Sequence, residues 1–213
     1  MQFTSEQRLD DGVLEREFTV GKIPGILWTP GSATAPAPLI LVGHPGGLHK
    51  MYPRLVARAQ HSAAEGFASA TIELPGSGDR LVLPLVEKAV PEWRATLDAV
   101  LSLPEIGGPV GYAGGVIAIG IRLAVVEPRI SAALLFAGSF MPRTMFEEAR
   151  QVTIPLQVLL QWDDEGNDRQ LALDVFDAFG SKEKTLHANR GGHTGVPQFE
   201  IDAGARFFGR HLS

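Results

Sequence analysis

Cysteine is missing from this chain of 213 residues. Its absence excludes disulfide bonds, metal sites built from thiolates and a cysteine nucleophile. Long apolar stretches are also missing. No run approaches the roughly 18 residues that a membrane span needs, and residues 1–20 lack the basic and then apolar segments of a signal peptide. Basic side chains are outnumbered by acidic ones, 19 against 24, which argues against a nucleic-acid binder. We therefore expect a cytoplasmic protein that binds neither membrane nor nucleic acid.

The composition is otherwise ordinary. Hydrophobic residues make up 45% and charged residues 20% of the chain, as in a typical globular domain. The length fits one domain with a full core. The only segment that resembles a linker, residues 30–38, is rich in proline and alanine, but too little chain precedes it to form a domain of its own. We predict a single domain over residues 1–213.

Short apolar runs alternate with segments of helical periodicity along the chain. The apolar runs predict strands over residues 13–20, 23–29, 39–43, 68–74, 109–112, 132–136, 155–161 and 184–188. Apolar residues at spacings of three and four predict helices over residues 51–65, 91–103, 114–126, 144–151, 171–179 and 199–211. This alternation predicts an α/β fold, with a mostly parallel sheet of about eight strands, helices on both faces and an antiparallel hairpin at one edge. Ligands of such sheets bind at the carboxyl ends of the strands, so the residues that follow each strand are candidates for a site.

A glycine-rich turn follows the strand at residues 109–112. The segment Gly111-Tyr-Ala-Gly-Gly115 has the pattern of the G-x-S-x-G turn that carries the nucleophile of many hydrolases, but Ala113 stands where that serine would be. A second register places Val116 at the nucleophile position, between Gly114 and Ala118. It lacks the final glycine, so we favour Ala113. Neither residue has a nucleophilic atom.

Backbone donors for a developing negative charge are predicted at two of these strand ends. In the segment Gly43-His-Pro-Gly-Gly47, the N–H of Gly46 or Gly47 could donate to an oxyanion, whereas Pro45 has no N–H. The N–H of Gly114 would be a second donor, at the start of a helix whose dipole favours negative charge. A plain tight turn is the alternative for the first segment, because glycine and proline cluster in many loops.

An acid and a histidine follow later strands. Asp163 and Asp164 come directly after the strand at residues 155–161, and His193 lies on a loop bounded by glycines. In a triad the acid accepts the imidazole N–H and fixes the tautomer. The order nucleophile position, acid, histidine is that of the α/β-hydrolases. A solvated acidic turn and a surface histidine are the alternatives.

With these residues in place, the chain resembles the α/β-hydrolase superfamily, and more narrowly the small lidless esterases related to dienelactone hydrolase. The resemblance rests on residues 43–47, on residues 73–80, on the glycine-rich turn and on Gly192-His193. It implies an α/β-hydrolase fold without a large lid domain. It also favours Asp164 over Asp163 as the acid, because Asp164-Glu165 is similar to the acidic pair common at that place.

Several residues beside these strand ends are candidates for the pocket wall: His44, Gly47, Tyr112, Phe140 and Met141. Structural hydrogen bonding is the alternative for His44, and packing of a short helix is the alternative for Phe140 and Met141. A metal site at His44 and His49 lacks a carboxylate at suitable spacing, so we expect no metal and no cofactor.

The resemblance implies a hydrolase of carboxylic esters or lactones that uses a Ser-His-Asp triad. We favour an inactive variant in which Ala113 replaces the serine, because the acid, histidine and glycine-rich loops are all retained. Such a loss costs about 10⁶-fold in kcat and spares binding. Two alternatives stay open: a natural binding protein with a hydrolase pocket, and an enzyme in which His193 and Asp164 activate water directly. We expect a small ester or lactone as the binding partner, and a homodimer as the protein assembly, if the chain forms one.

Overall fold

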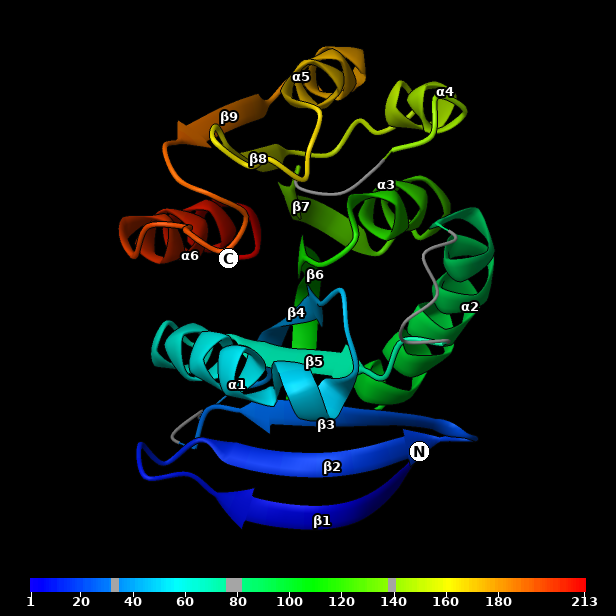
Figure 1. The fold of residues 1–213 in the computed structure, drawn as a ribbon. Helices are drawn as coiled ribbons and strands as arrows, with labels where there is room; N and C mark the ends of the chain where they lie inside the picture. Colours follow the sequence, from blue (N-terminus) through cyan, green and yellow to red (C-terminus); the bar gives the residue numbers. More distant parts are fainter. Residues whose placement is uncertain (32–34, 76–81, 138–140) are drawn as a thin grey trace.

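The computed structural model describes residues 1–31, 35–75, 82–137 and 141–213. Within these ranges the chain forms one sheet of nine strands in the order β1-β2-β3-β5-β4-β6-β7-β8-β9 (Figure 1). The strands are β1 (Gln2–Arg8), β2 (Leu14–Val20), β3 (Ile23–Thr29), β4 (Ala37–Gly43), β5 (Ala68–Ile72), β6 (Ile106–Gly114), β7 (Ile130–Phe136), β8 (Leu156–Gln161) and β9 (Lys184–Asn189). Pairing is antiparallel from β1 to β5 and parallel from β5 to β9. The predicted mostly parallel sheet with an antiparallel edge is confirmed.

Helices cover both faces of this sheet (Figure 1). They are α1 (Leu48–Ala64), α2 (Val82–Leu101), α3 (Ile117–Val126), α4 (Met145–Ala149), α5 (Arg169–Ala178) and α6 (Phe199–His211). Apolar side chains of α1 and α6 pack on one face, and those of α2 to α5 pack on the other. Between β7 and β8 the described residues form only the short α4, which leaves no large lid domain. None of the described helices is long and apolar enough to cross a membrane.

Neighbouring side chains of β6 point to opposite faces of the sheet, as the pleat of a strand requires. Tyr112 enters the core beneath α2 and α3, where its ring meets Trp93 edge-on with 6.2 Å between the centroids. Ala113 enters the smaller cluster beneath α1 and α6. The side of the sheet that carries α1 and α6 therefore receives only alternate residues of the central strand.

β1 and α2 differ most from the prediction. β1 was not expected because all seven of its side chains are exposed, so its sequence shows no apolar alternation and only backbone pairing to β2 defines it. α2 begins at Val82 rather than at Pro91, which lies inside the helix. Pro91 is exposed, so its ring meets solvent on the outer side of the helix. A proline is therefore a weak sign of a helix start when the residues before it are also helical.

Candidate active site

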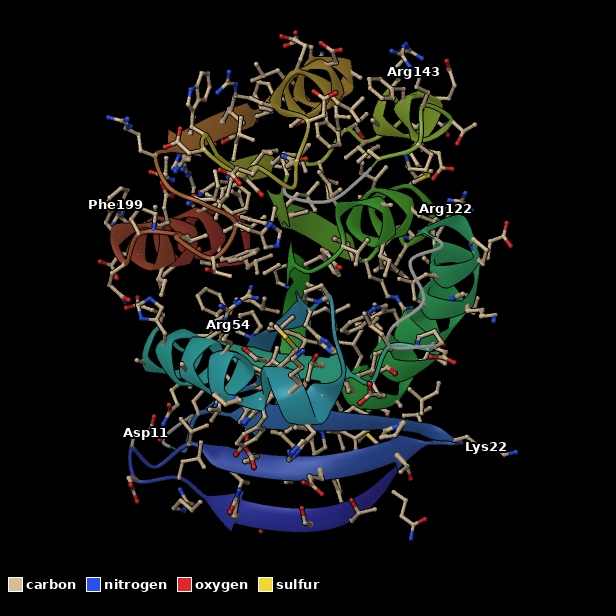
Figure 2. All side chains as sticks on the ribbon, viewed as in Figure 1. Asp11, Lys22, Arg54, Arg122, Arg143 and Phe199 are labelled. Atoms are coloured by element: carbon tan, nitrogen blue, oxygen red, sulfur yellow. The ribbon has the colours of Figure 1, made fainter. Side chains whose placement is uncertain are left out.

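A pocket of about 460 Å³ lies between α1 and α6. Its floor is the face of the sheet that includes Val42, Ala113 and Leu134, and its walls are the facing sides of the two helices. Figure 2 shows Arg54 on α1, the helix of one wall, and Phe199 at the exposed start of α6, the helix of the other wall. One end of the pocket reaches the carboxyl ends of the parallel strands. This is the place where open parallel sheets bind their ligands.

His193 and Asp164 form a hydrogen-bonded pair at that end. Nδ1 of His193 lies 2.7 Å from Oδ2 of Asp164. A carboxylate can only accept, so the imidazole hydrogen sits on Nδ1 and the lone pair on Nε2 stays available. The Asp164 side chain is 3% exposed and its other oxygen accepts the N–H of Gly166 at 3.0 Å, whereas the His193 side chain is 51% exposed. A buried acid that orients an accessible histidine is the arrangement of a general base.

Asp163 has a different task on the same turn. Its Oδ2 accepts the N–H of Gly191 at 3.2 Å, and its own N–H donates to the Gly191 carbonyl at 3.2 Å. Gln161 adds a hydrogen bond of 3.3 Å from Nε2 to the carbonyl of Gly192. Of the two acids that the sequence left open, Asp164 contacts His193, and Asp163 holds the loop that carries it.

The ring of His193 rests on an aromatic side chain at the end of β7. Phe136 meets it edge-on, with 5.3 Å between the centroids. Aromatic rings favour this arrangement because the positive edge of one faces the negative face of the other. Nothing in the sequence marked Phe136 for the site, since it reads as the last residue of an ordinary buried strand.

The turn between β6 and α3 lies later than predicted. β6 continues through Ala113 to Gly114, and Ala113 pairs with both neighbouring strands. α3 begins at Ile117, so the turn itself consists of Gly115 and Val116. Gly114 and Gly115 have φ angles of +80° and +70°, which glycine adopts without steric cost. The helix expected from residue 114 onward is therefore three residues too long at its start.

Backbone packing leaves no room for a side chain at Gly115. A Cβ there would lie 2.9 Å from Cα of Gly43 and 3.0 Å from the backbone N of His44. Val116 is then the first residue of the turn with a side chain. Its backbone is extended, with φ −79° and ψ 117°, and it caps α3. Val116 borders the pocket, but its side chain is buried in the core beneath α2 to α5, whereas Ala113 lies in the cluster on the pocket side of the sheet. The residue of the first register therefore faces the pocket, and that of the second register faces the opposite core.

The loop after β4 carries two of the predicted pocket residues, His44 and Gly47. His44 is buried, lines the pocket, and donates from Nε2 to the carbonyl of Ile72 at 2.8 Å. Burial lowers its pKa, so the ring stays neutral and makes a structural hydrogen bond. Gly47 is the N-cap of α1 and, like Gly46, is not among the described residues that line the pocket. The first N–H of α1, at Leu48, donates to Oε2 of Glu73 at 2.9 Å, so the predicted donors at Gly46 and Gly47 stay a prediction.

Two other predicted wall residues, Tyr112 and Met141, do not line this pocket. Tyr112 faces the opposite side of the sheet, and Met141 is buried in the core beneath α2 to α5. Phe140 lies outside the described residues, as does most of the predicted turn at residues 73–80. An apolar residue such as Met141 can be buried on either side of the sheet, so the sequence did not predict which side it would take.

α1 is held against the sheet by a buried carboxylate. Glu15 on β2 is 3% exposed and accepts hydrogen bonds from Nε1 of Trp28 at 2.6 Å and from the hydroxyl of Tyr52 at 2.9 Å. Trp28 belongs to β3, and Tyr52 belongs to α1. The pair of donors therefore fixes the first turns of the helix that forms one wall of the pocket.

Arg58 reaches the pocket from that wall, and sequence reasoning missed it. A Cβ built on Gly114 would lie 2.8 Å from Nη1 of Arg58, so the guanidinium covers the end of β6. Burial lowers the pKa of the Arg58 guanidinium. The side chain is nevertheless partly exposed, and it lines the pocket. In sequence Arg58 is one of several charged residues on an amphipathic helix, and only the fold shows that it faces inward.

Glu200 fixes the opposite wall. It is 4% exposed, and its carboxylate accepts from Nδ2 of Asn189 at 2.8 Å and contacts Nδ1 of His187 at 2.7 Å. Both partners belong to β9, so the first turn of α6 is joined to the last strand of the sheet. Across the described ranges, no three His, Asp or Glu side chains converge in a way that could hold a metal ion.

Esterases of known structure share this architecture. A cold-adapted esterase from an Arctic intertidal metagenomic library is 27% identical over the full length of both chains, with a TM-score of 0.86. The fold is that of the α/β-hydrolases. An acetyl xylan esterase from Paenibacillus sp. R4 is 15% identical over 99% of this chain and 88% of that one, with a TM-score of 0.75. An esterase from Pyrococcus furiosus is 12% identical over 100% and 93%, with a TM-score of 0.72. No family model and no curated protein matches the sequence.

These α/β-hydrolases bear on function to different degrees. At 12% and 15% identity the last two show the shared fold alone. The Arctic esterase, similar over its whole length and in sequence as well as in fold, supports an ester hydrolase role for this chain.

Proposed function

We propose that this protein hydrolyses a carboxylic ester or lactone by direct attack of water, with His193 as the general base and Asp164 as the residue that orients it. The observation that carries the proposal is the 2.7 Å pair of His193 and Asp164 at the end of a pocket whose floor includes Ala113 at the predicted nucleophile position. The similarity to the Arctic esterase supports ester hydrolysis as the reaction class.

A covalent mechanism lacks its nucleophile. An acyl-enzyme requires a hydroxyl or thiol beside the histidine, and both Ala113 and Val116 are apolar. Ser62 and Thr194 also line the pocket, but neither is hydrogen-bonded to His193 among the described residues. The hydrogen-bonded pair of His193 and Asp164 is present and needs no nucleophilic side chain to activate water. We therefore favour the water-attack alternative over the inactive triad.

The reaction balances without a covalent intermediate. Nε2 of His193 takes a proton from water while the water oxygen attacks the carbonyl carbon of the ester. The C–O bond to the leaving alcohol then breaks, and the imidazolium returns the proton to the alkoxide. Asp164 stabilises the imidazolium through its bond to Nδ1. The N–H of Gly114, together with an N–H of Gly46 or Gly47, is the expected pair of donors to the oxyanion.

Replacement of the base tests this function. With p-nitrophenyl acetate as substrate, His193→Ala should lower kcat/KM by about 10²–10⁴-fold, the usual contribution of a general base. His49→Ala, on the exposed surface of α1, is the matched control and should keep the activity. The wild-type protein should show no burst of nitrophenol and no labelling by a fluorophosphonate. If the wild-type protein is no faster than His193→Ala, the pocket serves binding instead of hydrolysis.

A hydroxyl introduced at the turn separates the two registers. Ala113→Ser should make the protein react with the fluorophosphonate, because Ala113 lies on the floor of the pocket whose end carries His193. Val116→Ser should stay unlabelled, because the side chain of Val116 lies in the core beneath α2 to α5. Labelling of Val116→Ser alone would move the nucleophile position to the second register.

A further inference from the structure

The pocket continues well beyond the end that carries His193. Its floor follows β4 from His44, directly after the strand, back to Ile40, which spans about 13 Å at the rise of a strand. On α6 the lining residues run from Glu200 to Phe208, which spans about 12 Å at the rise of a helix. The sheet and the helix therefore give similar lengths, and most of the pocket lies along the face of the sheet, away from the strand ends.

Two aromatic side chains close the inner end of the pocket. Phe208 lies over Gly111, because a Cβ on that glycine would be 2.6 Å from Cε1 of the ring. Gly111 pairs with Ile40, so this ring stands at the level where the floor ends. Phe67 lines the pocket from just before β5, two residues ahead of Ser69, which also pairs with Ile40. Both rings are buried, so together they set the depth of the pocket.

Between its two ends the pocket is mainly apolar. Its lining there comes from the sheet and from both helices: Ile40, Val42, Leu55, Leu134, Ile201 and Ala205. Among the described lining residues, the charged groups of α1 lie elsewhere, since Arg58 covers Gly114 at the end of β6 and Arg54 is exposed. His61 reaches across the opening toward Asp202 of α6, with 3.9 Å between Nε2 and Oδ1. A ligand in this part of the pocket gains free energy mainly by burying apolar surface.

We propose that this part of the pocket binds an unbranched acyl chain of about eight carbons, with its carbonyl at His193 and its methyl end against Phe67 and Phe208. Each C–C bond advances an extended chain by roughly 1.3 Å, so eight carbons with a contact at each end fill about 12 Å. The preferred substrates are then esters of unbranched acids of this length. This inference rests on the proposed function for the reaction, but not for the binding.

Methyl ketones test the binding without turnover, because they keep the carbonyl of an ester and have no leaving group. The probes are methyl propyl, methyl pentyl, methyl heptyl and methyl nonyl ketone, each titrated into the wild-type protein by calorimetry. Each added methylene should raise the affinity about fourfold, so each step up to the heptyl ketone should gain about 10- to 20-fold. The step from heptyl to nonyl should gain less than about threefold, because the longer chain meets Phe67 and Phe208.

A ring added at Ala205 tests where the chain lies. Ala205 lines the pocket from α6, about one turn before Phe208, so Ala205→Phe should fill the inner part. The heptyl ketone should bind about 10- to 100-fold more weakly, and the propyl ketone should change by less than about threefold. Ala203→Phe adds the same ring to α6 outside the described lining residues and should leave the whole series unchanged. If Ala205→Phe does not fold, as judged by its thermal transition, Ala205→Leu replaces it and should give the same order with a smaller loss.

The outcomes separate this inference from the proposed function. Affinity that does not depend on chain length, or equal weakening of all four ketones by the variant at Ala205, would overturn the inference. Binding that strengthens with chain length, without hydrolysis of p-nitrophenyl octanoate, would refute the proposed function alone. Hydrolysis of p-nitrophenyl acetate, without any effect of chain length on binding, would refute this inference alone.

Discussion

Gly115→Ala is the sharpest test of how the functional turn is packed. The added Cβ would lie 2.9 Å from both Cα and the carbonyl carbon of Gly43, and 3.0 Å from the backbone N of His44. All three are backbone atoms at the end of β4, so they cannot turn aside as a flexible side chain would. The φ angle of +70° adds about 1–2 kcal/mol for a residue with a Cβ, and the overpacking adds about 1–3 kcal/mol. We expect Gly115→Ala to lower the free energy of unfolding by about 2–5 kcal/mol.

Gly21→Ala separates the two contributions. Gly21, in the hairpin between β2 and β3, has a φ of +60°, and no atom lies within 4 Å of the position of its Cβ. It should cost only the conformational part, about 1–2 kcal/mol. Urea unfolding at neutral pH, followed by circular dichroism, measures both losses on the same scale. Equal losses for the two variants would mean that the turn is not packed against β4.

Two predictions concern protonation. Burial and the contact with Glu15 raise the pKa of Tyr52 to about 12, and burial raises the pKa of Tyr112 as well. Because the folded chain holds these protons more tightly than the unfolded one, stability should fall as pH rises from about 10 to about 12. A phenolate band between pH 10 and 11 under native conditions would contradict this. Arg129 lowers the pKa of Glu127 to about 2, so the stability that this carboxylate contributes is lost as pH falls from about 4.5 to about 2. Glu127→Gln should therefore cost about 1–3 kcal/mol at pH 7 and almost nothing at pH 2, and equal losses in urea unfolding at both pH values would contradict it.

The sheet and the acid–histidine end of the site were readable from sequence for a physical reason. Strands buried on both faces are short apolar runs between glycines and prolines, and each ends in polar residues only where the chain leaves the core. Asp164 follows such a run at β8, whereas His193 follows the edge strand β9, which has no fully buried residue. The parallel pairing of these two neighbouring strands brings the acid and the histidine together. Helix α6 was predicted with the bounds that it has, since its apolar residues keep a helical spacing throughout.

The turn and the cation were not readable. Apolar periodicity continues from β6 into α3, and the sequence does not show which glycine is the last residue of the strand. Only the φ angles of Gly114 and Gly115, and the close approach of Gly115 to Gly43, show where β6 ends and the turn begins. The inward direction of Arg58 depends on how α1 rotates against β4 and β6, which a single charged residue on an amphipathic helix cannot reveal.

The link between Glu200 and β9 has a mechanical consequence. Asn189 is the last residue of β9, and Glu200 lies in the first turn of α6. Their hydrogen bond joins the two ends of the loop between these elements, and His193 is part of that loop. A movement of α6 that widens the pocket must therefore also move this loop. His193 and α6 therefore move together. A ligand that pushes α1 and α6 apart would also change the distance between the His193 imidazole and the bound ligand.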